Sequence, residues 1–234
     1  MEQVKKQLLQ ASINYGSMPM DTVKTIVFAL CDAYDLHQPT ELNAIKGIIV
    51  EIDTEIRKYD QTLQFVKHPL NGQEYLVFAL LLTNQACKFQ PNYTDTERKY
   101  FYKLLETLAS SDDYGIEWNN IYTVANQLPA NAQHPLSKER IQELENIWVS
   151  QGYFLAVEDK IYFGPRTMLE YGKYLKNNFS DVITDCVLCN KIVYWDVKCS
   201  ECEVKLHRDC IRKYLIKKST CPSCKKTWNT RLSL

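Results

Sequence analysis

Glycine and proline are scarce in this chain, and long apolar runs are absent. The 234 residues include only seven glycines and eight prolines, and no tract has low complexity. Long disordered regions are therefore not expected. No apolar run reaches the ~18 residues that a membrane-spanning helix needs. The longest run, residues 75–82, is predicted to be a buried strand, and 45% hydrophobic and 24% charged residues favour a soluble globular protein with no membrane contact.

Recognisable catalytic motifs are also missing from the first 180 residues. There is no glycine-rich phosphate loop and no nucleophile elbow. His37, His68 and His134 lie in three separate predicted loops, where a lone histidine is expected to be solvated. Cys31, on the apolar face of a predicted helix, is expected in the core. Cys87 stands alone in a polar connector and is expected to be an incidental thiol, so we predict no catalytic residue here.

Cysteine is concentrated near the other end of the chain. Seven of the nine cysteines and one histidine fall between residues 186 and 224, in four closely spaced pairs. The pairs are Cys186 and Cys189, Cys199 and Cys202, His207 and Cys210, and Cys221 and Cys224. Each pair can occupy two corners of a tetrahedron, and two pairs complete a structural zinc site. Eight ligands therefore predict two zinc ions.

A disulfide framework is the competing interpretation of these cysteines. It requires a secreted protein, but the opening residues, Met-Glu-Gln-Val-Lys-Lys, lead into an amphipathic segment without an apolar signal core or cleavage site. Paired Cys-x-x-Cys spacing without a secretory signal favours metal over disulfides. We therefore expect zinc.

The net charge of zero hides an asymmetry. Residues 181–234 carry 11 Lys and Arg against 6 Asp and Glu, whereas residues 1–180 carry 17 against 22. A basic module can approach nucleic acid or an acidic protein surface. Solvated lysines on a small domain are an equally good interpretation.

Hydrophobic periodicity predicts three helices and a strand pair at the start of the chain. The helices are expected over about residues 2–15, 21–31 and 41–56, with Asp21 as the cap of the second. Strands are expected over 62–67 and 73–83, joined by a turn containing proline, asparagine and glycine. Three helices followed by a hairpin is the order of a winged-helix domain.

The same order is predicted a second time after a polar connector at residues 84–93. Thr94 and Glu97 form a capping box for the first helix. The further elements expected are a helix over 118–128, a helix that is capped by Ser137 and ended by Gly152, strands at 153–157 and 160–163, and a closing helix over 166–179.

We therefore predict an α+β chain of three domains. Two tandem winged-helix domains occupy residues 1–90 and 91–180, and the zinc module occupies 181–234. The third helix of each winged-helix domain carries more acidic than basic residues, as at Glu51, Glu55, Glu139, Glu143 and Glu145. Acidic helices would repel phosphates in a DNA groove. Docking to another protein is the better assignment for both.

The ligand order, four Cys, one His and three Cys, resembles the cross-braced RING and PHD families. In those families the first and third pairs share one ion, and the second and fourth share the other. The resemblance implies that Cys186, Cys189, His207 and Cys210 hold one zinc ion, and that Cys199, Cys202, Cys221 and Cys224 hold the second.

The whole chain resembles one family in particular, the non-SMC element one family of the chromosomal SMC five–six complex. The resemblance is carried by the strand run from Tyr75, the helix and wing from Trp148 to Gly164, and the zinc-ligand pairs. It implies a nuclear, chromatin-associated subunit in DNA repair, docked to a MAGE-family subunit and in contact with a kleisin subunit. It also implies a ubiquitin ligase that depends on the MAGE partner.

A RING-type ligase holds a ubiquitin-loaded conjugating enzyme close to a substrate lysine. Contacts in RING proteins map here onto Leu188, Tyr214 and Pro222, and Lys225 stands where many RINGs have a ubiquitin-pinning arginine. A lysine lacks the bidentate fork of arginine, so strong activity without a partner is not expected. Leu188 and Tyr214 could equally fill the small core of the module.

Two alternatives remain open at this point. The module could be a RING-like fold that only docks the complex together. It could also be a PHD histone reader, although Ser219 stands where PHD fingers usually have a tryptophan. DNA contact is expected only within the assembled complex.

Overall fold

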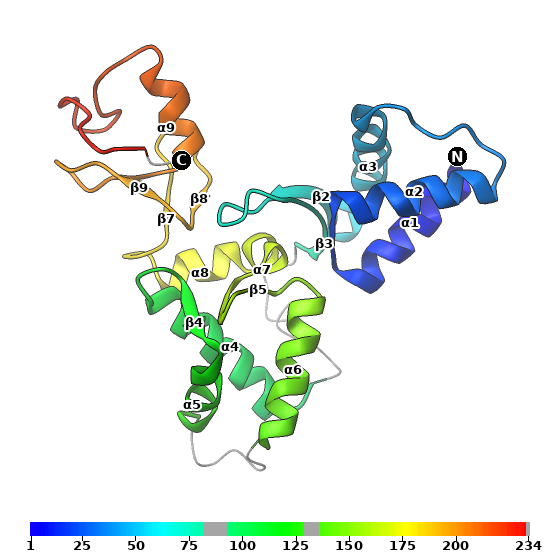
Figure 1. The fold of residues 1–234 in the computed structure, drawn as a ribbon, viewed down its shortest axis with the longest axis horizontal. Coiled ribbons are helices and arrows are strands. Elements are labelled where there is room, and N and C mark those ends of the chain that lie inside the picture. The colour runs from blue at the N-terminus through cyan, green and yellow to red at the C-terminus, as the bar shows by residue number, and fades with distance from the viewer. Residues whose placement is uncertain (82–92, 129–135, 233–234) are drawn as a thin grey trace. The chain divides into compact units, whose positions relative to one another are not determined.

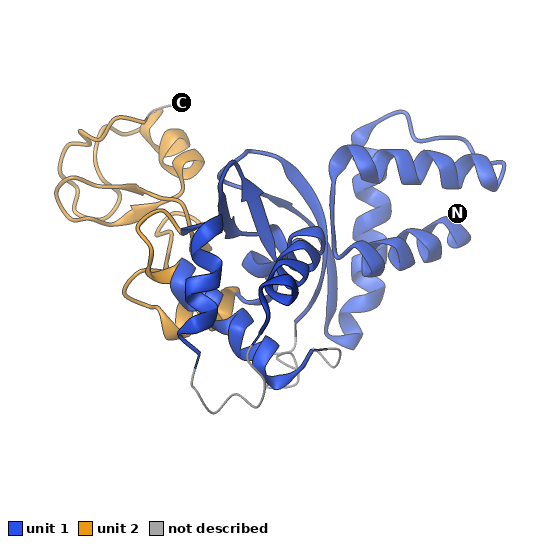
Figure 2. Ribbon diagram, turned by 60° about the horizontal axis from the view of Figure 1, so that its bottom comes forward, with its two compact units in different colours: residues 1–108, 115–171 blue, residues 109–114, 172–234 orange. Residues whose placement is uncertain are grey.

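The computed structural model describes residues 1–81, 93–128 and 136–232. The chain forms two compact units, residues 1–108 with 115–171, and residues 109–114 with 172–234 (Figure 2). Within the described ranges, no helix combines the length and apolar character needed to cross a membrane. The predicted connector at 84–93, with Cys87, and the loop containing His134 lie almost wholly outside the described residues, and the three-domain division stays a prediction.

The first repeat of unit 1 joins three helices to a three-stranded antiparallel sheet (Figure 1). The elements are α1 (Glu2–Tyr15), β1 (Ser17–Pro19), α2 (Met20–Ala33), α3 (Leu42–Ile56), a 3-10 turn (Arg57–Tyr59), β2 (Gln61–Lys67) and β3 (Glu74–Leu80). The strand order is β1-β3-β2, with Gln61 opposite Leu80 and Pro19 opposite Tyr75. The predicted helices and hairpin are present, but β1 lies where only a helix break was expected.

The first core is built by the apolar stripe of α3 and by the central strand. Ile45, Ile48, Ile49, Ile52 and Ile56 are buried and pack with Val23, Val27, Cys31, Leu63 and Leu76. The placement of Cys31 in the core is thereby confirmed. The prediction that Asp21 caps α2 is wrong, because α2 begins at Met20 with Pro19 at the capping position, and Asp21 lies in the first turn.

The second repeat of unit 1 has the same order of elements. They are α4 (Asp95–Ser110, whose last two residues belong to unit 2), β4 (Gly115–Glu117), a 3-10 turn (Trp118–Asn120), α5 (Ile121–Asn126), α6 (Lys138–Ser150), β5 (Phe154–Val157) and β6 (Lys160–Phe163), with strand order β4-β6-β5. Both predicted caps are confirmed. The Thr94 N–H donates to Glu97 at 2.7 Å and the Glu97 N–H to Thr94 Oγ1 at 3.2 Å, and Ser137 Oγ accepts from the Arg140 N–H at 3.2 Å.

The two repeats of unit 1 contact each other through close backbone approaches. Gly152 has φ +79°, and a Cβ there would lie 2.2 Å from Ser17 Cβ. His68 is fully buried, and its Nε2 lies 2.8 Å from the carbonyl oxygen of Phe163 in the other repeat. The expectation that His68 is a solvated loop residue is therefore wrong, because the hairpin that carries it packs against the second repeat.

The predicted closing helix is two helices rather than one. α7 (Pro165–Glu170) belongs to unit 1 and α8 (Gly172–Asn178) to unit 2. A Cβ on Gly172 would lie 3.1 Å from both Ile192 Cδ1 and Tyr194 Oη, so the chain approaches closely at the point where the second helix starts. Helical periodicity on either side of residue 171 did not reveal this break.

Unit 2 packs short hairpins and one helix around the cysteines. Its further elements are β7 (Thr184–Asp185), β8 (Ile192–Val193), β9 (Val197–Lys198), β10 (Lys205–Leu206) and α9 (Arg208–Leu215). The segment 109–114, which is the end of α4 and the turn after it, belongs to this unit: Trp195 Nε1 donates to the Asp113 carbonyl at 3.1 Å, and the Tyr114 hydroxyl to the Val182 carbonyl at 3.3 Å. This participation of a distant segment had no signal in the sequence.

Candidate metal centre

Three of the four ligand pairs sit in the same kind of tight turn. In each turn the backbone N–H of the residue after the second cysteine donates to the carbonyl of the first. The acceptor–donor pairs are Cys186 and Asn190 at 2.8 Å, Cys199 and Glu203 at 2.9 Å, and Cys221 and Lys225 at 3.1 Å. Asn190, Glu203 and Lys225 have φ of 55°, 55° and 64°, although none is glycine. A left-handed residue costs ~1 kcal/mol, so these turns need a compensating interaction, which a shared metal ion supplies.

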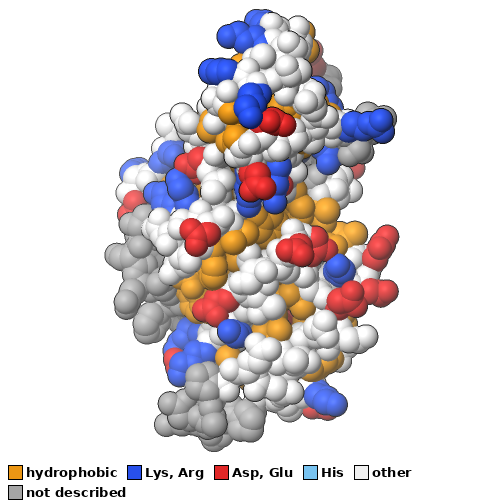
Figure 3. Space-filling model, turned by 90° about the vertical axis from the view of Figure 1, so that its left-hand side faces the viewer, with side chains coloured by type: hydrophobic (Ala, Val, Ile, Leu, Met, Phe, Trp, Pro, Cys, Tyr) orange, Lys and Arg blue, Asp and Glu red, His pale blue; other side chains and the backbone are white. Residues whose placement is uncertain are grey.

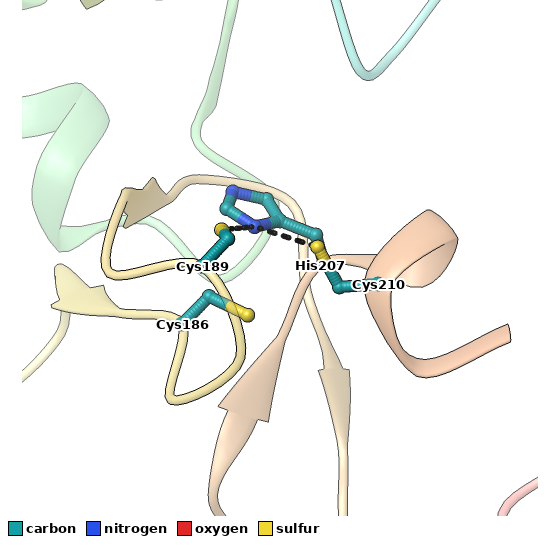
Figure 4. A group of neighbouring side chains, drawn as sticks. All are labelled: Cys186, Cys189, His207 and Cys210. Carbon is teal, nitrogen blue, oxygen red and sulfur yellow. Dashed lines mark hydrogen bonds between the residues drawn. The ribbon is translucent and has the colours of Figure 1, made fainter. Parts of the chain in front are cut away.

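The first cluster joins Cys186 and Cys189 to His207 and Cys210 (Figure 4). His207 Nδ1 lies 3.3 Å from Cys189 Sγ and 3.8 Å from Cys210 Sγ. His207 Nε2 lies 2.9 Å from the Ile192 carbonyl oxygen, which can only accept a hydrogen bond. The proton is therefore on Nε2, and the lone pair of Nδ1 points at the three sulfurs. Such a hydrogen bond fixes the tautomer of a metal-ligating histidine.

The second cluster joins Cys199 and Cys202 to Cys221 and Cys224. Cys199 Sγ lies 3.9 Å from Cys224 Sγ, and Cys202 Sγ lies 3.8 Å from Cys221 Sγ. Four sulfurs around zinc at ~2.3 Å would be about 3.8 Å apart in a tetrahedron. The two clusters interleave along the chain, so the predicted cross-braced pairing and the two zinc ions are confirmed.

The electrostatics of the sulfurs also fit a divalent cation. Burial alone would raise the pKa of the Cys186 thiol, but hydrogen bonds from backbone N–H groups to its sulfur outweigh this effect. The pKa of Cys186 is therefore lowered. The Val204 N–H is the main cause that lowers the pKa of Cys202 to about 7. Burial and the neighbouring sulfurs raise the pKa of Cys210 to about 12. Four crowded donors of this kind lose all their protons only when a cation such as Zn²⁺ takes up the charge.

The residues predicted to contact a conjugating enzyme lie on the same module. Leu188 and Tyr214 are half-buried and pack on the apolar cluster of Cys186, Val193, Val197, Leu206 and Ile211. Pro222 is half-buried, and Lys225 is exposed with its Nζ donating to the Pro222 carbonyl at 2.6 Å. Their role stays a prediction. Val187 and Ile216, which no motif in the sequence marks, are 49% and 80% exposed.

Comparison with known proteins matches a family model described as "RING-like domain" to residues 186–224. The chain is 37% identical to the Drosophila melanogaster "non-structural maintenance of chromosomes element 1 homolog" over 98% of this chain and 97% of the relative. It is 20% identical to the Homo sapiens protein of the same name, over 97% and 85%. A chain of the solved "Nse1-Nse3-Nse4 complex" superposes with a TM-score of 0.76 at 22% identity, covering 97% of both chains.

The interleaved clusters and the family match together define a RING-like protein with two zinc sites. The full-length similarity is more specific than the zinc module. The chain belongs to the non-structural maintenance of chromosomes element 1 family, which confirms the family resemblance noted in its sequence.

Proposed function

We propose that this protein is a RING-type ubiquitin ligase subunit of an SMC-associated complex. The carrying observation is that all seven module cysteines lie in the two interleaved clusters. Cys31 is buried in the first repeat, so no described cysteine is presented as a nucleophile for a ubiquitin thioester. The chemistry that suits such a module is non-covalent: it holds a loaded conjugating enzyme in a reactive orientation. The zinc ions stiffen the module and take no part in the transfer.

The conjugating enzyme would rest on Leu188, Tyr214 and Pro222. The first two are anchored on the buried core of the module, which fixes their positions, yet each keeps part of its side chain accessible. Val187, exposed beside Leu188, adds apolar surface. Pre-placed apolar side chains of this kind bind with little loss of conformational entropy.

Lys225 gives a physical reason for dependence on a partner. Its ammonium group is bonded to the Pro222 carbonyl within its own turn. An ammonium group also lacks the planar fork with which an arginine holds two acceptors at once. A bound partner would have to supply the restraint on ubiquitin that this residue does not.

The two repeats of unit 1 would be winged-helix domains that dock the partners. Their element order and strand orders, β1-β3-β2 and β4-β6-β5, support that classification. The structural neighbour comes from a complex named for Nse1, Nse3 and Nse4. By this analogy the partners are a MAGE-family Nse3 subunit and a kleisin Nse4 subunit, in the nucleus on chromatin, in DNA repair.

The test is ubiquitin discharge over a panel of conjugating enzymes, with the chain alone and with its two partners. We expect discharge that depends on the partners. Leu188→Ala should reduce it about tenfold while the chain still binds two zinc ions. Val204→Ala is the matched control, because Val204 also packs half-buried on the module core but is not among the predicted contacts.

Absence of any discharge above the background rate of the conjugating enzymes, with the partners present and across the whole panel, would contradict the proposal. In that case the module would be a docking element only, a function that the folded-back Lys225 side chain also permits. The match to a RING-like family supports ubiquitin transfer over histone reading.

A further inference from the structure

One surface of unit 2 carries charge that neither zinc binding nor ubiquitin transfer uses. It consists of Arg208, Arg212, Lys213, Lys217 and Lys218, here called the α9 cationic surface. All five side chains are exposed. They lie within eleven residues along α9 and the turn that follows it, and the only acidic residue in that stretch is Asp209.

The face of α9 that carries these charges is fixed by the opposite face. Ile211 is fully buried, Cys210 is a zinc ligand, and Tyr214 and Leu215 pack against the module core. A helix has about 3.6 residues per turn, so Arg208 and Arg212 form a row on the outward side, with Lys213 in the next row. The helix cannot rotate to bury these charges without breaking a zinc site.

Among the described residues, most of this charge has no acidic ion-pair partner. Arg212 pairs with Asp209 at 3.9 Å, a loose surface contact between half-exposed groups that is worth little. For Arg208, Lys213, Lys217 and Lys218, no acidic group of the described chain lies within ion-pair distance. By contrast, Lys205 and Lys226 of the same unit pair with Asp196 and Glu201.

Zinc binding lowers the net positive charge of the module, so the positive potential depends more on where its Lys and Arg side chains lie. The formal balance of residues 181–234 is +5 when cysteine is counted as neutral. Seven thiolates and two Zn²⁺ ions add three negative charges, which leaves the module at +2. The excess negative charge lies at the two clusters, because the seven thiolates gather there. The positive potential of the module is therefore concentrated on surfaces such as the α9 cationic surface rather than spread evenly.

Figure 3 shows Lys and Arg side chains standing out at the top of the face it presents. From these charges we infer that the α9 cationic surface binds the phosphate backbone of duplex DNA. Side chains one helical turn apart lie about 6 Å from each other, and cations at this spacing can contact successive phosphates of a DNA strand. Proteins that bind single strands stack bases on exposed aromatic rings, but the large apolar side chains exposed on the described module are Val187 and Ile216, so a duplex is favoured.

The binding would be independent of base sequence and sensitive to salt. Each neutralised phosphate contributes a slope of about −0.9 in log K against log salt concentration. Four free cations therefore predict a slope of about −3 to −4. This DNA contact would not require the conjugating-enzyme residues, because on α9 Tyr214 faces the module core and the cations face solvent.

The test measures anisotropy of a fluorescent duplex against the full-length, zinc-loaded chain at about 50 to 200 mM salt. The variant Arg208→Gln, Lys213→Gln, Lys217→Gln, Lys218→Gln removes the four free charges. The control variant Lys173→Gln, Lys191→Gln, Lys198→Gln, Arg231→Gln removes four exposed charges elsewhere in unit 2. We expect the α9 variant to lose about tenfold or more in affinity and most of the salt slope, and the control to stay within about threefold of the unmodified chain.

Several outcomes would overturn the inference. Absence of binding by the unmodified chain at the lowest salt is one, and an equal loss in the two variants is another. Tighter binding to a single strand would rule out the duplex assignment. Displacement of the duplex by polyglutamate at equal charge concentration would show that the surface selects acidic proteins instead. Zinc content and circular dichroism of both variants establish that they are folded.

Discussion

At the scale of single residues, Glu145 is the clearest departure from ordinary behaviour. It is fully buried on α6, and its Oε1 lies 2.9 Å from the Tyr100 hydroxyl, which also reaches the Ile121 carbonyl at 3.3 Å. One phenolic proton cannot satisfy both acceptors. A protonated Glu145 donates to Tyr100, and Tyr100 then donates to Ile121. Burial raises the pKa of Glu145 to about 8, so this carboxyl group is largely neutral at pH 7.

Glu145→Gln tests this protonation state. The folded pKa of Glu145 lies above its unfolded value of about 4.3, so its stabilising effect is complete below pH ~4 and is lost as the pH rises towards 8. The glutamine variant keeps a donor to Tyr100 and has nothing to ionise. We expect equal unfolding free energies near pH 4.5 and a variant more stable by about 1–3 kcal/mol near pH 7.5. Urea unfolding across this range measures the difference.

Glu143→Gln is the control for this prediction, since Glu143 is exposed on the same helix. Its stability profile should run parallel to that of the unmodified chain. If the Glu145→Gln profile were also parallel, Glu145 would be ionised in the folded protein.

His68 is a second ionisable residue whose burial could not be predicted from the sequence. Its Nε2 faces the Phe163 carbonyl oxygen, and its Nδ1 lies 3.3 Å from the Leu70 N–H, which donates. Only the neutral ring with the proton on Nε2 satisfies both contacts, and burial accordingly lowers the pKa of His68. A lone histidine before a proline gave no sign of this, because its two contacts depend on how two repeats pack.

At the scale of elements, the contact between the repeats depends on glycines at places that side chains would block. Gly152 ends α6 and enters β5 with a left-handed backbone, directly against Ser17 at the start of β1. Gly16, with φ +70°, has the Arg166 guanidinium and the Gln151 carbonyl oxygen within 3 Å of the position of a Cβ. The sequence predicted helix ends at both glycines. It did not predict that the two ends meet.

Gly152→Ala should therefore be strongly destabilising. The added Cβ would lie 2.2 Å from Ser17 Cβ, and alanine is also strained at φ +79°. We expect a loss of about 2–4 kcal/mol in the unfolding free energy of unit 1, measured by urea unfolding.

The matched control is Gly47→Ala, because Gly47 lies within α3 and a Cβ there meets nothing within 4 Å. That change should stabilise the protein by about 0.5–1 kcal/mol. A Gly152→Ala variant as stable as the unmodified chain would mean that the repeats do not approach as closely as the structure has them.

At the scale of the whole molecule, the two units differ in what stabilises them. Unit 1 has two apolar cores, including the rings of Phe101, Trp148 and Phe154 in the second repeat. The described part of unit 2 has strands of two residues each and a small core that includes the cluster cysteines themselves. Structures of this kind usually depend on their metal for folding.

Removal of zinc should therefore unfold unit 2 and leave unit 1 folded. We expect two zinc ions per chain by elemental analysis. After chelation, amide protons of residues 184–215 should lose protection from hydrogen exchange while those of α3 and α6 keep it. Readdition of zinc should restore protection. A stoichiometry of one zinc ion, or protection in unit 2 that survives chelation, would contradict this division.

The sequence by itself determined the features that depend on local order along the chain. The ligand pairs follow from their spacing, since a tight turn brings together two donors that have two residues between them, and the caps at Thr94 and Ser137 join atoms within one helical turn. The tertiary structure decided the rest: the short strands β1 and β4, the break between α7 and α8, the burial of His68 and Glu145, and the placement of the 109–114 segment in unit 2. Each of these depends on contacts between residues far apart in the sequence, and hydrophobic periodicity within one segment carries no information about its distant neighbours.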